Sequence, residues 1–131
     1  LQASVGKALS YSLAKQPRLG LELLAQTEAI VPADGLSDAE GIYKLAQAYA
    51  VLGDKAAVLR LLRRSIEGGF FCYPYLITDQ LLAGLRGEPE YAVLLESARQ
   101  RHEAFKRREG DAPQRGRRRP PRTAAQACGA T

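Results

Sequence analysis

Chemically reactive side chains are scarce in this chain. It has one histidine, His102, and two cysteines, Cys72 and Cys128, in 131 residues. His102 falls on the apolar face of a charged helical pattern, where packing explains it better than a role as a catalytic base. The cysteines show neither a metal-ligand spacing nor a disulfide framework, so a reducing compartment and a cytoplasmic location are the simpler inference. No glycine-rich phosphate loop occurs either, and we expect no enzyme, cofactor or metal site.

Long apolar segments are also missing. No run approaches the roughly 18 to 20 consecutive apolar residues that a membrane-spanning helix needs. The start, LQASVGKALSYSL, lacks the cationic, strongly apolar and cleavable design of a secretory signal. We therefore expect a soluble protein with no membrane partner. Because the first residue is Leu1 and not methionine, we also expect a piece of a longer protein or a processed product.

Positive charge is concentrated at the carboxyl-terminal end. Residues 1–99 hold ten Lys or Arg and eleven Asp or Glu, a net charge of −1, whereas residues 100–131 hold nine and three, a net charge of +6. From Gly110 onward large apolar residues are almost absent, which predicts a disordered tail at 109–131 after a helical domain at 1–108. A solvated tail and a nucleic-acid contact both remain open for its arginines, which are Arg115, Arg117, Arg118, Arg119 and Arg122.

The clearest structural pattern is a pair of helices in residues 39–66. Apolar or small residues recur at helical spacing in both halves, at Ile42, Leu45, Ala46, Tyr49 and Leu52 and then at Val58, Leu61, Leu62, Ser65 and Ile66. Gly53 tolerates the left-handed conformation that ends a helix, and Asp54 can cap the next one. The segment therefore predicts an antiparallel helical hairpin.

Further helices are expected on both sides of this hairpin. Periodicity predicts them at 3–15, 19–30, 78–85 and 89–108, with the first ended by Gln16 and Pro17. Ser37 and Glu40 fit a capping box at the start of the central hairpin. The aromatic side chains between 70 and 75 are interpreted either as a hydrophobic plug at a helix junction or as a docking pocket.

The central hairpin resembles a tetratricopeptide repeat, whose period is about 34 residues. The matching positions are Ile42, Leu45, Ala46, Tyr49, Gly53, Asp54, Leu62 and Ser65. Residues 68–95 are similar to the closing segment of tetratricopeptide regions in bacterial signalling proteins such as serine/threonine kinases and nucleotide cyclases. The resemblance implies an all-α array of hairpins, an α-solenoid of about six helices.

The same resemblance implies a function in protein binding. The chain would be a protein–protein interaction scaffold, the C-terminal repeat module of a larger bacterial signalling or regulatory protein, with further repeats upstream. Its first helices would line a concave face and hold a protein, a peptide or a neighbouring domain through Glu40, Tyr43, Gln47, Ala50 and Val51. Packing against the preceding hairpin is an equal alternative for Tyr43. The competing hypothesis is a nucleic-acid-associated protein that uses the basic tail.

Overall fold

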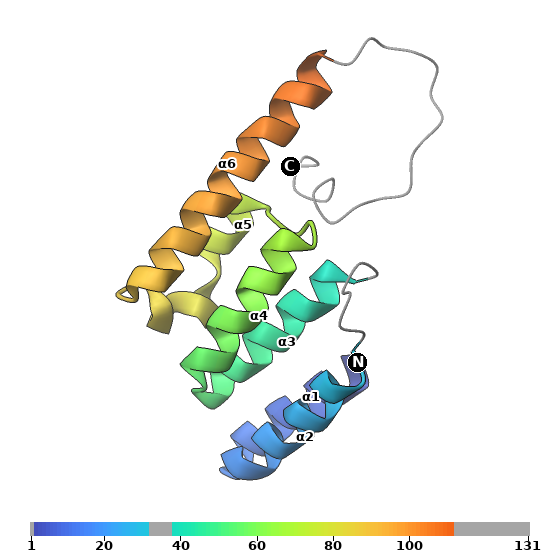
Figure 1. The fold of residues 1–131 in the computed structure, drawn as a ribbon. Helices are drawn as coiled ribbons and strands as arrows, with labels where there is room; N and C mark the ends of the chain where they lie inside the picture. The colour runs from blue at the N-terminus through green and yellow to red at the C-terminus, as the bar shows by residue number, and fades with distance from the viewer. Residues whose placement is uncertain (1, 32–37, 112–131) are drawn as a thin grey trace.

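The computed structural model describes residues 2–31 and 38–111 of the chain. Every regular element in these ranges is helical, so the predicted all-α class is confirmed. The elements in chain order (Figure 1) are α1 (Gln2–Leu13), α2 (Pro17–Ala29), α3 (Ala39–Leu52), α4 (Lys55–Glu67), α5 (Tyr73–Thr78), the 3₁₀ helix η1 (Gln80–Leu85) and α6 (Pro89–Asp111). Since α6 runs to Asp111, the helical domain extends beyond the predicted boundary at residue 108, and most of the predicted tail lies outside the described residues.

The first hairpin consists of α1 and α2. Pro17 begins α2, because its fixed backbone angle suits the first helical turn and its missing N–H is not needed there. Lys15 makes the reversal with a left-handed φ of 57°. Gly20 brings three helices together, since a Cβ at this position would lie 3.0 Å from the carbonyl oxygen of Ala8 in α1 and 3.0 Å from Leu52 in α3.

The predicted central hairpin forms as α3 and α4. The buried residues include Ile42, Leu45, Ala46 and Tyr49 on α3 and Val58, Leu61, Leu62, Ser65 and Ile66 on α4. Gly53 ends α3 with φ of 85°, and the carboxylate of Asp54 accepts a hydrogen bond from the backbone N–H of Ala57 at 3.1 Å. Both local signals that predicted the turn are confirmed.

The start of α3 differs from the predicted capping box. Asp38 is the cap, and its carboxylate accepts a hydrogen bond from the backbone N–H of Gly41 at 2.7 Å. Ser37, the predicted cap, lies outside the described residues. A carboxylate suits this position because the exposed N–H groups of a helix start carry partial positive charge.

The segment after α4 forms two short helices in place of the single helix predicted at 78–85. Asp79 separates α5 from η1, with an extended backbone (φ −71°, ψ 111°) and a carboxylate that accepts from the N–H of Leu81. The aromatic residues before it pack largely as a plug. Phe70 stacks on Tyr43 of α3 with ring centres 4.6 Å apart, whereas Tyr75 contacts both rings by its edge and stays 50% exposed.

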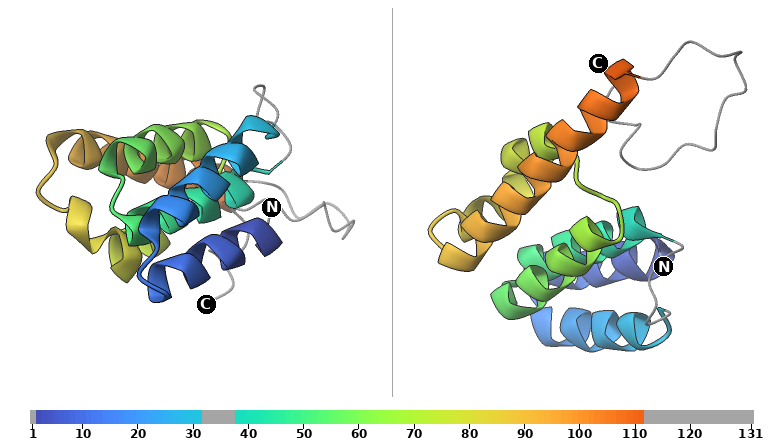
Figure 2. Two further views of the ribbon diagram at one scale, coloured as in Figure 1. Left: turned by 90° about the horizontal axis from the view of Figure 1, so that it is seen from below. Right: turned by 45° about the horizontal axis from the view of Figure 1, so that its top comes forward.

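Each hairpin packs on the one before it in the chain (Figures 1 and 2). α3 contacts both α1 and α2, η1 lies on α3, and α6 packs against α4 and α5. The first helices of successive hairpins are therefore neighbours, as in a stacked array. The predicted α-solenoid arrangement of these hairpins, and any further repeats upstream, stay predictions.

Ion pairs of α4 tie the hairpins together. Arg60 of α4 binds the carboxylate of Glu28 in α2, which also accepts from the hydroxyl of Tyr49 at 3.1 Å. The hydrogen bond from Arg60 holds the pKa of Glu28 below its ordinary value. Two further pairs connect α4 to the region where α6 begins: Lys55 with Glu88, in the turn before α6, at 3.1 Å, and Arg63 with Glu90, in its first turn, at 2.8 Å.

The side chain of Cys72 is 4% exposed, and Cys128, the second cysteine of the sequence, lies outside the described residues. The reducing compartment inferred from the cysteine spacing stays a prediction. In the described ranges, every helix is too short or too polar to cross a lipid bilayer.

Candidate functional site

A groove opens where the first helices of the three hairpins meet. Its volume is about 310 Å³, and its walls come from α1, α3 and η1. The lining residues are Val5, Gly6, Leu9, Lys44, Gln47, Ala48 and Leu81. Most of these side chains are apolar, so the groove offers a surface that water solvates poorly.

The α1 wall depends on a glycine. Val5 and Leu9 are half-buried and occupy one face of the helix, with Gly6 beside them. A Cβ at Gly6 would meet nothing within 4 Å, so the missing side chain leaves open space in the groove. A glycine inside a helix costs about 1 kcal/mol relative to alanine. Packing does not require this glycine, but close approach of a ligand to the backbone would.

The α3 wall supplies the polar groups. α3 is buried on most of its circumference, because α1, α2, α4 and η1 all surround it. Lys44, half-buried, sits in the groove wall and its ammonium lies 3.2 Å from Glu40, one turn earlier. This pair is well exposed, so it contributes little to stability and leaves Lys44 available for another anion.

The third wall is held in place by Asp79. Its carboxylate accepts hydrogen bonds from the hydroxyl of Tyr43, from the side-chain amide of Gln47 at 2.7 Å and from the backbone N–H of Leu81 at 2.9 Å. Burial, followed by the hydrogen bond to this carboxylate, raises the pKa of Tyr43 far above its ordinary value, so the hydroxyl remains a donor. The contacts fix η1 on α3 and thereby set the position of Leu81 in the groove.

The partner-binding residues predicted from the sequence divide into three groups. Gln47 lines the groove, although its amide already binds Asp79. Tyr43 is 2% exposed and packs on Phe70, in the segment that follows the central hairpin. The sequence had suggested contact with a partner or with the preceding hairpin, and the structure shows a third environment. Glu40 and Val51 are exposed and Ala50 is half-buried, and all three lie outside the groove lining.

Six of the seven groove residues were absent from the prediction: Lys44 and Ala48 lie on α3 itself, and the other four come from other elements. Val5, Gly6 and Leu9 are on α1, and Leu81 is on η1. A local signal existed for Gly6, since a glycine inside an otherwise regular helical pattern often marks a close backbone approach. No comparable signal marks Leu81, whose place depends on the contact between Asp79 and α3.

Side chains that could ligate a metal ion do not cluster in the described residues. No group of three or more His, Cys, Asp or Glu side chains in residues 2–31 and 38–111 comes close enough to ligate a metal ion. His102 is half-buried on α6, its Nδ1 is buried without a hydrogen-bond partner, and burial lowers its pKa. Burial therefore favours the neutral form of this imidazole.

Comparison with known proteins found no matching family model, no matching curated protein and no matching solved structure. The resemblance to tetratricopeptide repeats therefore stays a prediction based on the residues quoted above.

Proposed function

We propose that this chain is a protein–protein interaction scaffold that binds a partner peptide in the groove between α1, α3 and η1. The observation that carries the proposal is the open, mainly apolar groove at the meeting point of three successive hairpins. Its volume of about 310 Å³ is at the lower end of the range for ligand sites, which suits one or two side chains better than a large cofactor.

The chemistry of the lining defines the peptide. Val5, Leu9 and Leu81 favour an apolar anchor residue, whose burial contributes about 1.5 to 3 kcal/mol. Gly6 admits the anchor close to the helix backbone. Lys44 favours an acidic residue beside the anchor, since its exposed pair with Glu40 can be exchanged at little cost.

The walls of the groove are already ordered without a partner. Asp79 fixes η1 against α3, so binding needs little further ordering of the protein, and ordering is a main cost of association. A setting in a larger bacterial signalling protein would follow from the tetratricopeptide resemblance alone. A cytoplasmic location also stays a prediction.

The test fills the groove without disturbing the fold. Peptides selected from a display library against the full chain provide the probe, and affinity is measured by fluorescence anisotropy. Gly6→Leu places a side chain in open space, and Gly110→Leu is the matched control, because a Cβ at Gly110 also meets nothing within 4 Å and the residue lies at the far end of α6.

We expect Gly6→Leu to weaken binding at least tenfold, which corresponds to about 1.4 kcal/mol, and Gly110→Leu to leave it unchanged. Circular dichroism checks that both variants remain helical. Equal affinity of a folded Gly6→Leu variant and the unmodified chain would show that the peptides bind elsewhere and would overturn the proposal.

A further inference from the structure

The only histidine of the sequence, His102, lies where α6 makes its last contacts with the rest of the described fold. α6 packs on α4 and α5. Ala98 is fully buried, His102 and Phe105 are half-buried, and every described side chain beyond Phe105 is exposed. Because these three residues stand at i, i+4 and i+7, they share one face of the helix. His102 therefore belongs to the last stretch by which α6 is held.

One contact of this stretch is a pair of aromatic rings. The ring of Phe71, in the segment before α5, meets that of Phe105 edge to face, with ring centres 6.2 Å apart. Both residues are only half-buried. Phe70, the neighbour of Phe71, is 7% exposed and stacks on Tyr43 of α3, so its position has support that α6 does not provide. Opening at the end of α6 should therefore cost less free energy than unfolding the hairpins.

The imidazole of His102 is packed in a way that suits only its neutral form. Its Nδ1 is buried, and no described group forms a hydrogen bond with it. A neutral imidazole tolerates this, because its proton can sit on Nε2 while Nδ1 keeps a lone pair. A protonated imidazole carries an N–H at both nitrogens. Protonation would therefore place a buried donor at Nδ1 without an acceptor, which is unfavourable.

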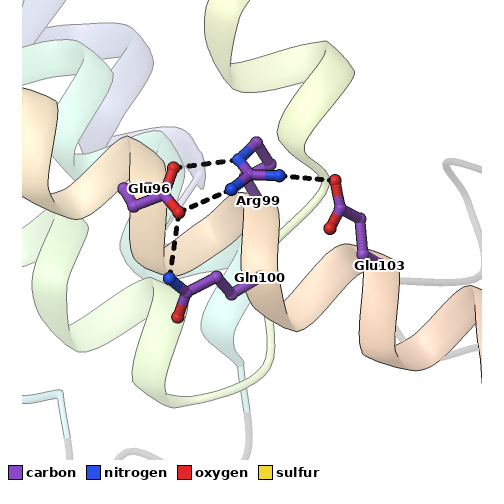
Figure 3. A network of polar contacts seen from close by, with 4 residues as sticks. All are labelled: Glu96, Arg99, Gln100 and Glu103. Atoms are coloured by element: carbon purple, nitrogen blue, oxygen red, sulfur yellow. Dashed lines mark hydrogen bonds and ion pairs between the residues drawn. The ribbon is translucent and has the colours of Figure 1, made fainter.

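The charges on α6 do not compensate for this. Lys106, one turn after His102, has the sign of a protonated imidazole, and like charges at i and i+4 repel each other. Glu103 has the opposite sign, but its carboxylate binds Arg99 at 2.7 Å, and Arg99 also binds Glu96 at 2.7 Å (Figure 3). Burial, followed by the charge of Lys106, therefore holds the pKa of His102 below its ordinary value in spite of Glu103.

The elements packed against α6 supply no compensating charge within the described residues. α5 has no charged side chain, and its titratable groups are Tyr73 and Tyr75. In the segment 68–72 the titratable side chain is that of Cys72, which is 4% exposed. None of the charged groups of α4 is among those that shift the pKa of His102; they are Lys55, Arg60, Arg63, Arg64 and Glu67.

We infer that His102 is a pH switch for the end of α6: protonation of its imidazole below neutral pH releases residues 99–111 from Phe71 while the hairpins stay folded. Release relieves the buried N–H, because water can accept from both ring nitrogens. It also exposes the rings of Phe71 and Phe105, which cover each other at neutral pH. Histidine is the only side chain whose ordinary pKa lies in this range, so the switch depends on a single residue.

Hydrogen exchange tests the inference in the full chain. Exchange of backbone amides is followed by mass spectrometry at about pH 7.5 and about pH 5.5, on either side of the ordinary histidine pKa, with labelling times scaled so that intrinsic exchange is equal. Residues 101–108 should exchange about threefold or more faster at the lower pH, because opening removes the unpaired buried donor. α3 and α4 should exchange equally at both pH values.

Two variants assign the effect to the imidazole. His102→Gln cannot be protonated in this range and keeps a residue that favours a helix, so its residues 101–108 should exchange equally at both pH values. Arg101→Gln is the matched control, because it changes the neighbouring exposed position and should keep the full effect of pH. Circular dichroism checks that both variants are helical, and the comparison of the unmodified chain at two pH values needs no variant.

Three results would overturn the inference. The first is equal exchange of residues 101–108 at both pH values in the unmodified chain. The second is an increase that His102→Gln keeps or that Arg101→Gln also loses. The third is an increase of the same size in α1 to α4, because that would show a loss of global stability and no local release.

Discussion

Substituting Asp79 tests the contact that positions the third wall of the groove. Asp79→Ala removes the acceptor of the Tyr43 hydroxyl and of the Gln47 amide, and it removes the cap of η1. Tyr43 is 2% exposed, so its hydroxyl would be left buried without a partner, which costs about 1 to 3 kcal/mol. Loss of the cap adds about 0.5 to 2 kcal/mol. We expect a total destabilisation of about 2 to 4 kcal/mol, a large fraction of a typical folding free energy.

A double-mutant cycle measures the contact itself. Tyr43→Phe removes the hydroxyl but keeps the ring stacked on Phe70. In the double variant Tyr43→Phe/Asp79→Ala no buried hydroxyl remains, so the combined loss should be smaller than the sum by about 1 to 2 kcal/mol. Urea unfolding followed by circular dichroism at 222 nm gives the three free energies on one scale.

The opposite result would restore the earlier hypothesis. If Asp79→Ala and Tyr43→Phe each changed the unfolding free energy by less than about 0.5 kcal/mol, the contact would not form in solution. Tyr43 and Gln47 would then be available to a partner, and substituting both should weaken partner binding with helicity intact, as the sequence predicted. With the contact present, that double substitution should instead lower stability.

Three further results are expected. Gly20→Ala should lower the free energy of unfolding by about 1 kcal/mol, because the new Cβ meets a backbone carbonyl of α1. Gly6→Ala should raise it by about 0.5 to 1 kcal/mol, because the new Cβ meets open space and alanine favours a helix. Thermal unfolding should therefore show a lower melting temperature for the first variant and a higher one for the second. Ala46→Leu should cost about 1 to 3 kcal/mol by overpacking, and an unchanged melting temperature would contradict close helix contact. Folding lowers the pKa of His102 from 6.5 and that of Glu28 from 4.5. The free energy of unfolding should therefore decrease as pH falls below 6.5 and again as it falls below 4.5. His102→Gln should reduce the first decrease and Glu28→Gln the second, as measured by unfolding at a series of pH values.

The central hairpin was predictable because its signals are local. The helical period, the left-handed Gly53 and the Asp54 cap each act over a few residues of one segment, and all of them agree. The short helices after α4 were not predictable in the same way. Leu81, Leu82 and Leu85 fit a helical period, but the extended backbone of Asp79 separates α5 from η1. Its carboxylate caps η1 and also accepts a hydrogen bond from Tyr43, 36 residues earlier in the chain. Sequence periodicity contains no information on a contact of that range.

The predicted stripe of partner-binding residues and the groove lie on different faces of α3, and the difference concerns the rotation of that helix. At 100° per residue, the predicted stripe of Glu40, Tyr43, Gln47, Ala50 and Val51 and the observed wall of Lys44, Gln47 and Ala48 have mean directions roughly 60° apart. A helix buried against neighbours on most sides shows only a weak preference for one face, so its sequence does not indicate which narrow strip remains open. The packing of η1 on one flank covers Tyr43, and α1 on the other flank leaves space beside Gly6. The open strip therefore belongs to the arrangement of three hairpins, and any residue that moves η1 on α3 should change the groove as much as a residue that lines it.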